Sequence, residues 1–148
     1  ARHLVGLALQ MTMPGVPAVF AGDELGLTGV DGEHSRTPFP WSRAAEWDGP
    51  TVEVYRRWIA LRRTHVALRR GGLRWADAGD ESMTYLREHP EERLLVHAAR
   101  GPHTPVRLSL GGLGARGAET LEGEPARADG GVLELPAAGP GAHVYRLV

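Results

Sequence analysis

The sequence predicts an α+β fold, in which a helix, a strand, a long loop and a second helix precede a small antiparallel β-sandwich. Residues 1–13 are dense in Leu, Val, Ala and Met, as in a mostly buried helix, and the apolar run 16–21 is typical of a buried parallel strand. After residue 76 short apolar runs alternate with Gly and Pro, a pattern typical of antiparallel strands. We therefore divide the chain into an N-terminal region, residues 1–75, and a β domain, residues 76–148.

Turn signals separate the elements of the N-terminal region. Pro14 and Gly15 end the first helix, and the predicted strand stops at a glycine and two adjacent carboxylates, Gly22-Asp23-Glu24. A long loop follows, from residue 25 to about residue 49, and such loops are usually either functional or disordered. Its aromatic residues indicate an ordered loop, because disordered segments are poor in aromatics; they are Phe39, Trp41 and Trp47.

A second helix is expected to begin near Asp48 or Thr51, both suitable N-caps, with Pro50 in its first turn. One face of this helix is apolar, with spacings of four, three, four and three residues. The residues of this face are Val54, Trp58, Leu61, His65 and Leu68. We expect Trp58 in the core and His65 as an interior histidine with a hydrogen-bond partner. The arginine pairs of the helix lie largely off this face and are expected in solvent, and Gly71-Gly72 ends the helix.

The β domain is predicted from five apolar runs that turn residues separate at intervals of about 8–12 residues. These runs are 82–87, 94–99, 106–110, 132–135 and 142–147.

Composition excludes several classes of function. The chain of 148 residues is 42% hydrophobic and 24% charged, with a formal net charge of −1, so it has no general attraction for nucleic acid. It contains no cysteine, which excludes disulfides and thiolate metal sites, and no two histidines stand at metal-ligand spacing. No apolar run approaches the ~20 residues of a membrane span. We expect no metal, no cofactor, no nucleic acid and no membrane partner.

The motifs at 13–41 resemble the α-amylase family of glycoside hydrolases. In that family a GxPxxxxGDExG pattern marks the eighth barrel strand and its loop, and it is followed by Arg-x-Pro-hydrophobic-x-Trp. Here the second segment is Arg36-Thr37-Pro38-Phe39-Pro40-Trp41. The loop most resembles the branch of cyclomaltodextrinases, neopullulanases and α-glucosidases. The resemblance implies that residues 1–75 are the tail of a (β/α)₈ barrel and that 76–148 form the C-terminal β domain.

The same resemblance implies a retaining hydrolase acting on α-glucosidic bonds, through an oxocarbenium-like transition state and a covalent glycosyl-enzyme. Retaining glycosidases need two carboxyl groups about 5–5.5 Å apart. Asp23 and Glu24 are neighbours on a predicted strand and so would point to opposite sides of it. The family's catalytic carboxylates lie on earlier strands, upstream of residue 1. We therefore assign no catalytic residue here and expect the chain alone to be inactive.

Substrate contacts are expected on the rim of the barrel, which is built from the loops at the C-terminal ends of its strands. The resemblance places Arg36 near the sugar, since a guanidinium can hold a carboxylate and a hydroxyl in fixed geometry. Glu33 and His34 are further candidates for substrate binding; His34 stands where close relatives often have an acid. Asp23 and Glu24 either hold the loop in shape or bind sugar.

Trp41 could stack on a sugar ring, but we expect it to anchor the loop by packing on the protein core. The expected partners are an α-glucan or malto-oligosaccharide in the intact enzyme and the missing N-terminal barrel, with a cytoplasmic location. The alternative is a free-standing carbohydrate-binding or interaction module. Its apolar helix and unpaired strand would then need another cover, and a homo-oligomer would be expected.

Overall fold

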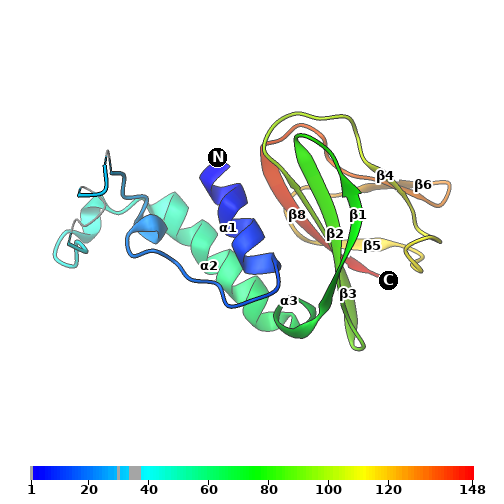
Figure 1. Cartoon of the computed structure of the whole chain (residues 1–148), viewed down its shortest axis with the longest axis horizontal. Coiled ribbons are helices and arrows are strands. Elements are labelled where there is room, and N and C mark those ends of the chain that lie inside the picture. Colours follow the sequence, from blue (N-terminus) through cyan, green and yellow to red (C-terminus); the bar gives the residue numbers. More distant parts are fainter. Residues whose placement is uncertain (1, 30, 34–37) are drawn as a thin grey trace.

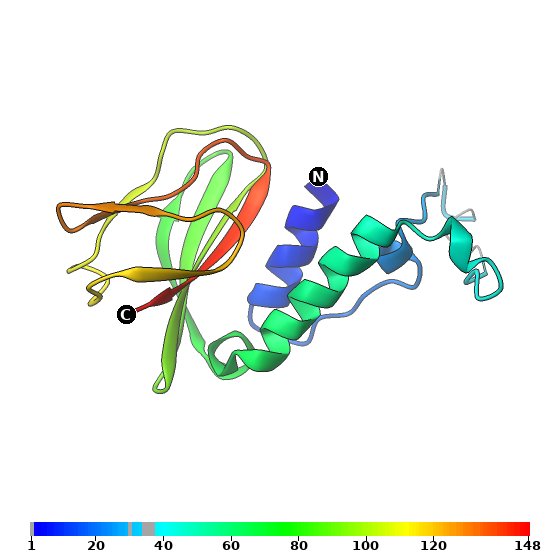
Figure 2. The same ribbon diagram turned by 180° about the vertical axis from the view of Figure 1, so that it is seen from behind.

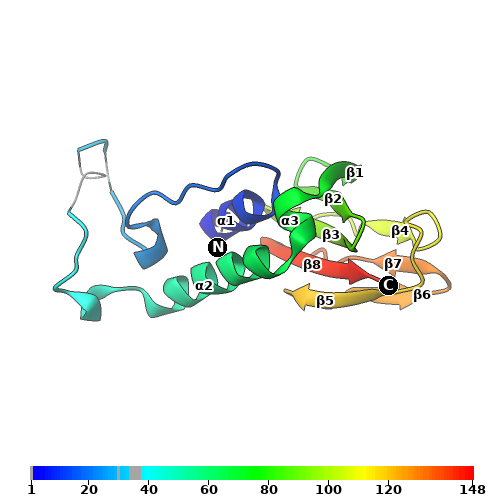
Figure 3. The same ribbon diagram turned by 90° about the horizontal axis from the view of Figure 1, so that it is seen from below.

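The protein has three layers. A computed structural model describes residues 2–29, 31–33 and 38–148. Helices cover one face of a five-stranded antiparallel sheet, and a three-stranded sheet covers the other face (Figures 1 and 3). The sequence-based α+β class, with a small antiparallel β-sandwich after the helices, is confirmed.

The helical layer contains α1 (Arg2–Thr12), α2 (Gly49–Thr64) and α3 (Val66–Arg70). Helix α2 begins where the sequence predicts it, after the N-cap Asp48. The Asp48 carboxylate accepts hydrogen bonds from the Thr51 backbone N–H at 3.4 Å and from the Thr51 hydroxyl at 2.7 Å. It thereby satisfies one of the N–H groups that the first turn of a helix leaves without a partner.

We expect Asp48→Ala to lower the free energy of unfolding by about 1 kcal/mol, because the first turn of α2 loses its cap. Asp48→Asn keeps the side-chain oxygen and should leave stability nearly unchanged. Urea unfolding followed by circular dichroism measures both variants. Equal losses in the two variants would show that the carboxylate charge matters and the cap does not.

The predicted second helix does not run unbroken to Gly71, because His65 interrupts it with an extended backbone (φ −94°, ψ 115°). Glu92 stabilises the break. Its carboxylate bonds His65 Nδ1 at 2.9 Å and accepts the Ala67 N–H, also at 2.9 Å, so it caps α3 from outside the helix. His65 is buried and has a partner, as the sequence predicts.

The five-stranded sheet has the order β1-β2-β3-β8-β5, and the three-stranded sheet has the order β4-β7-β6. The strands are β1 (Gly72–Ala78), β2 (Ser82–His89), β3 (Glu92–Ala99), β4 (Arg107–Ser109), β5 (Ala118–Glu122), β6 (Arg127–Asp129), β7 (Val132–Glu134) and β8 (Gly141–Leu147). Five of them coincide with the predicted apolar runs. Strands β1, β5 and β6 are additional, and β1 starts at Gly72, before the proposed domain boundary.

The predicted strand at 16–21 is wrong for this structure. Residues 16–20 have no regular secondary structure, and among the described residues no strand pairs with them. Val16 is 95% exposed and Phe20 is 60% exposed. A parallel strand exists only through hydrogen bonds to neighbouring strands, and the sheet of the β domain does not extend to this segment. The apolar composition of the segment is unsuited to solvent, but a sheet partner is not among the described residues.

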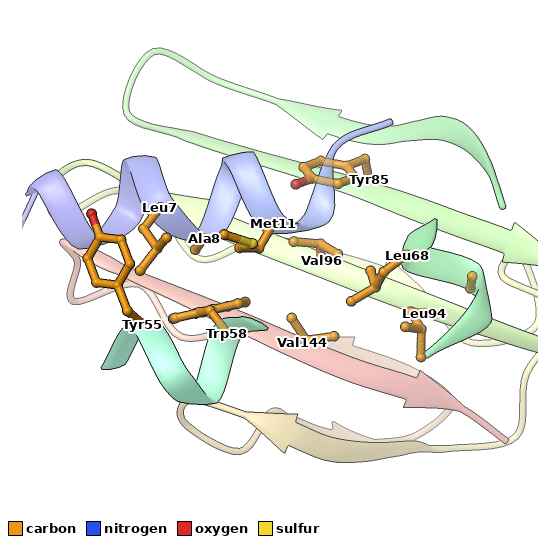
Figure 4. Packing of buried hydrophobic residues seen from close by; sticks show 11 residues of the cluster. Leu7, Ala8, Met11, Tyr55, Trp58, Leu68, Tyr85, Leu94, Val96 and Val144 are labelled. Carbon is orange, nitrogen blue, oxygen red and sulfur yellow. The ribbon is translucent and has the colours of Figure 1, made fainter. Parts of the chain in front are cut away.

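Two hydrophobic clusters lie on the two faces of the five-stranded sheet. The cluster under the helices, shown in Figure 4, includes Leu7, Met11, Trp58, Val96 and Val144. The other cluster joins the two sheets. Trp58 is 4% exposed, which confirms its predicted place in the core. Within the described residues, none of the helices has the length and apolarity needed to cross a membrane.

Candidate functional site

The Gly22-Asp23-Glu24 corner is a tight turn that closes on itself. The Glu24 carboxylate accepts the Gly22 N–H at 2.8 Å, and the N–H groups of Leu25 and Leu27 both donate to the Gly22 carbonyl at 3.0 Å. Gly22 has φ +108°, and a Cβ there would lie 2.8 Å from a methyl carbon of Leu27, so only glycine fits. Glu24 therefore shapes this corner, and it is engaged by the backbone.

The corner lies against helix α2 (Figure 2). Leu25, in the 3₁₀ turn Asp23–Leu25, is buried, and its carbonyl accepts the Asp48 N–H at 3.1 Å. Tyr55 of α2 lies near the two carboxylates. Burial and then the charges of Asp23 and Glu24 raise the pKa of Tyr55 to about 12, so its hydroxyl stays protonated and remains a hydrogen-bond donor. The sequence pattern alone assigns Tyr55 no role.

Beyond the corner the chain forms an exposed loop. Glu33 is exposed, and its N–H donates to the Asp31 carboxylate at 2.9 Å, which shapes a local turn. His34 and Arg36, the other two candidates for substrate binding, lie outside the described residues. The structure therefore gives the position of Glu33 alone among the three predicted substrate-binding residues.

An aromatic group orders the end of the loop, at the end of the molecule opposite the β-sandwich (Figure 3). The ring centroids of Phe39 and Trp41 are 4.2 Å apart, those of Phe39 and Trp47 are 6.2 Å apart, and Trp47 Nε1 donates to the Pro40 carbonyl at 3.2 Å. The expectation that Trp41 packs on the core is wrong, since its side chain is 77% exposed. The aromatic residues pack on each other here, because the described chain offers no core surface at this end.

Two buried arginines are central to the architecture, although the sequence pattern predicts the arginines of α2 in solvent. Arg62 of α2 and Arg87 of β2 are 8% and 1% exposed, and both donate hydrogen bonds to backbone carbonyls near the end of α1. One signal was available for Arg62. It follows Tyr55 and Trp58 at the spacing i, i+3, i+7, which puts all three on one buried side of α2.

A polar row crosses the inner face of the β-sandwich. Thr84, His97 and His143 are direct cross-strand partners on β2, β3 and β8. The Thr84 hydroxyl bonds His97 Nδ1 at 2.9 Å, and His97 Nε2 donates to the Pro136 carbonyl at 3.1 Å, which describes a neutral imidazole. In the described ranges, no three His, Asp or Glu side chains are placed to hold one metal ion.

Comparisons with known proteins support the resemblance to the α-amylase family. The chain is 31% identical over 94 residues to a cyclomaltodextrinase of a Bacillus species, a match that covers 62% of this chain and 17% of that enzyme. It is 29% identical over 139 residues to neopullulanase 2 of Thermoactinomyces vulgaris, covering 91% and 24% respectively. Among solved structures, an Anoxybacillus α-amylase superposes with a TM-score of 0.84 at 21% identity, over 98% of this chain and 32% of that one. No family model matches the sequence.

The chain is similar in sequence and in fold to the C-terminal part of α-amylase-family enzymes. It spans a quarter or less of the length of the curated relatives it matches, and about a third of the α-amylase structure. The family resemblance of the motifs at 13–41 is thus supported by relatives that match along most of the chain. The superposition on the α-amylase shows that the arrangement of helices and sandwich is the one found in that enzyme.

Proposed function

We propose that the intact protein is a retaining glycosidase that hydrolyses α-glucosidic bonds in α-glucans or malto-oligosaccharides, and that it works in the cytoplasm. This chain would supply part of the substrate rim and, as residues 76–148, the β domain that supports it. The observation that carries the proposal is the 29% identity to a neopullulanase over 91% of the chain, which includes the corner at Gly22 and the loop after it.

Within this proposal Glu24 holds the corner and Arg36, Glu33 and His34 contact sugar. The engagement of the Glu24 carboxylate with the Gly22 N–H supports the structural role of Glu24. The exposure of Glu33 leaves it accessible to a ligand. The catalytic carboxylates belong to the upstream part of the enzyme, so the chain by itself should not cleave a glycosidic bond. The upstream part would also cover the apolar segment 16–20.

Calorimetric titration of the purified chain with maltotriose, after its mass is checked by light scattering, tests the proposal. We expect no saturable heat at millimolar sugar, that is a Kd weaker than about 1 mM, because the rim lacks the barrel that organises it. The chain should also release no glucose from maltotriose. The coding sequence upstream of residue 1 should contain three carboxylate motifs of the family.

Saturable binding by the chain alone that Arg36→Ala abolishes would favour the other candidate, a free-standing carbohydrate-binding module. The exposed apolar segment 16–20 gives that candidate a consequence that can be measured. Such a module would need to cover the segment, so it should be a dimer or larger by light scattering. A monomer without sugar affinity, joined upstream to the carboxylate motifs, would support the glycosidase.

A further inference from the structure

The end of α1 is held by cations that come from other elements. A helix leaves its last carbonyls without partners inside the helix, and α1 has no basic residue in its own last turn. Arg62 Nη1 donates to the Met11 carbonyl at 2.8 Å and to the Met13 carbonyl at 3.2 Å, and its Nη2 donates to the Gly15 carbonyl at 2.5 Å. Arg87 Nη1 donates to the Thr12 carbonyl. We call these contacts of Arg62 and Arg87 the α1 clamp.

Arg87 also ties the clamp to the β domain. Its Nη2 donates to the Gly71 carbonyl at 2.7 Å and its Nε to the Gly72 carbonyl at 3.3 Å, where β1 begins. Beside it on the same strand, the Tyr85 hydroxyl lies 2.6 Å from the Thr12 hydroxyl. One strand of the sandwich therefore fixes both the end of α1 and the start of the sheet.

The clamp keeps two positive charges in a buried place without neutralising them. Among the described residues neither guanidinium forms an ion pair with a carboxylate. Burial lowers the pKa of Arg62 and of Arg87, and the charge of Arg62 lowers that of Arg87 further. Such an arrangement is costly and persists only where many acceptors compensate it. Here the acceptors are carbonyls at the negative end of a helix dipole.

The clamped carbonyls lie immediately before the segment that leads to the candidate rim. From residue 15 the chain runs back along α2 to the 3₁₀ turn of the corner (Figures 1 and 2). Between these ends residues 16–20 have no sheet partner among the described residues, and a bond from Gln10 to the Ala18 carbonyl is their contact with α1. The direction in which the chain leaves α1 is therefore set at the clamp.

We propose that Arg62 and Arg87 are positioning residues, which set the path of the chain out of α1 and thereby place the Gly22-Asp23-Glu24 corner relative to the β domain. The inference rests on the proposed function to the extent that the corner belongs to a substrate rim. According to this inference, the β domain stabilises the molecule and also positions the rim, through the guanidinium of Arg87.

Hydrogen–deuterium exchange of the 148-residue chain tests this without any sugar. In Arg87→Met and in Arg62→Met, we expect the bonded amides of Met13, Gly22 and Leu25 to exchange about tenfold faster or more, since local opening loses several charge-assisted hydrogen bonds. The amides at 94–98 in β3 and at 142–146 in β8 should stay as protected as in the wild type. Arg62→Lys, which keeps the charge but not the planar fork, should restore the protection only in part.

Arg93→Met is the matched control. Arg93 likewise donates to two carbonyls, those of Leu113 at 2.6 Å and Gly114 at 2.7 Å, but in the β domain away from the corner. It should speed exchange around 113–117 and leave residue 22 unchanged. Loss of protection at 94–98 would show that Arg87→Met fails to fold. In that case the exchange of Arg62→Met, a substitution on α2, tests the proposal.

Unchanged exchange at Gly22 and Leu25 in a folded Arg62 variant would overturn the proposal. Equal acceleration at the corner and in the sheet strands would also overturn it, because that result means general destabilisation. A failed glycosidase assignment leaves the exchange result intact, so the two failures can be told apart.

Discussion

Replacing Trp58 by alanine should lower the free energy of unfolding by about 3–5 kcal/mol, the usual range for removing a buried aromatic side chain. Trp58 is 4% exposed and packs in the cluster between α1, α2 and the sheet (Figure 4). The cluster joins residues of both helices and of the sheet, so the loss of the indole leaves a cavity where the helices meet the sheet. Such a loss is a large share of the roughly 5–15 kcal/mol that stabilises a typical domain.

Urea unfolding of Trp58→Ala and of a control variant, Trp75→Ala, measures the effect. Trp75 is a suitable control because it is 54% exposed on the edge strand β1, where its ring centroid lies 5.6 Å from that of Tyr85 in an edge-on arrangement. The control should lose about 1 kcal/mol or less. We expect one cooperative transition in each protein, since helices and sheet share a core. Two separate transitions in Trp58→Ala, with the strands surviving the helices, would show that residues 76–148 fold independently.

Acidification from pH 7.5 to pH 5 should destabilise the protein through His97. Burial, then the charges of His103 and His143, lower the pKa of His97 from 6.5 to about 4. Below pH 6.5 His97 binds a proton in the unfolded chain but stays neutral in the native chain. The free energy of unfolding therefore decreases as the pH decreases. The loss approaches about 3 kcal/mol by pH 4, at about 1.36 kcal/mol for each pKa unit.

The neighbours of His97 act in the same pH range. Burial is the largest cause that lowers the pKa of His143, against the opposing charges of Glu124 and Glu122, so its protonation also disfavours the native state. Carboxylates whose pKa is lowered in the native state, such as that of Glu92, add to the loss of stability only below pH 4.5, the pKa of a glutamate in the unfolded chain. The interval above pH 5 therefore reports mainly on the histidines.

Chemical denaturation at pH 7.5, 6.5, 5.5 and 5 compares the wild type with His97→Asn. The variant should be less stable at pH 7.5, because the bond to the Pro136 carbonyl is lost, but its stability should fall less steeply with acid. The control is His89→Asn, which removes a histidine from the end of β2, away from this polar row. Parallel slopes for the wild type and His97→Asn would rule out His97 as the source of the acid sensitivity.

Local patterns in the sequence predict much of this fold. The apolar face and the N-cap of α2 are determined by residues a few positions apart, Asp48 with Thr51 and Trp58 with Leu61. Five strands are predictable because each contains a short apolar run between turn residues. Strands β1, β5 and β6 escape prediction because their residues are exposed or half-buried, so no apolar run marks them.

Contacts between distant residues decided the rest. Glu92 stabilises the break at His65 from 27 residues away, and Arg87 caps α1 from 75 residues away. Neither contact leaves a mark near its target in the sequence. The segment 16–20 is the converse case, because its composition is that of a strand while its sheet partner is not among the described residues.

By itself the sequence determined the α+β class and the resemblance to the α-amylase family, because these depend on short motifs and local periodicity. Only the tertiary structure showed that two arginines are buried, that Trp41 is exposed and that the buried His97 has the rings of His103 and His143 as neighbours. Burial and hydrogen-bond partners depend on which elements pack together. Local sequence patterns do not show which distant residues come into contact.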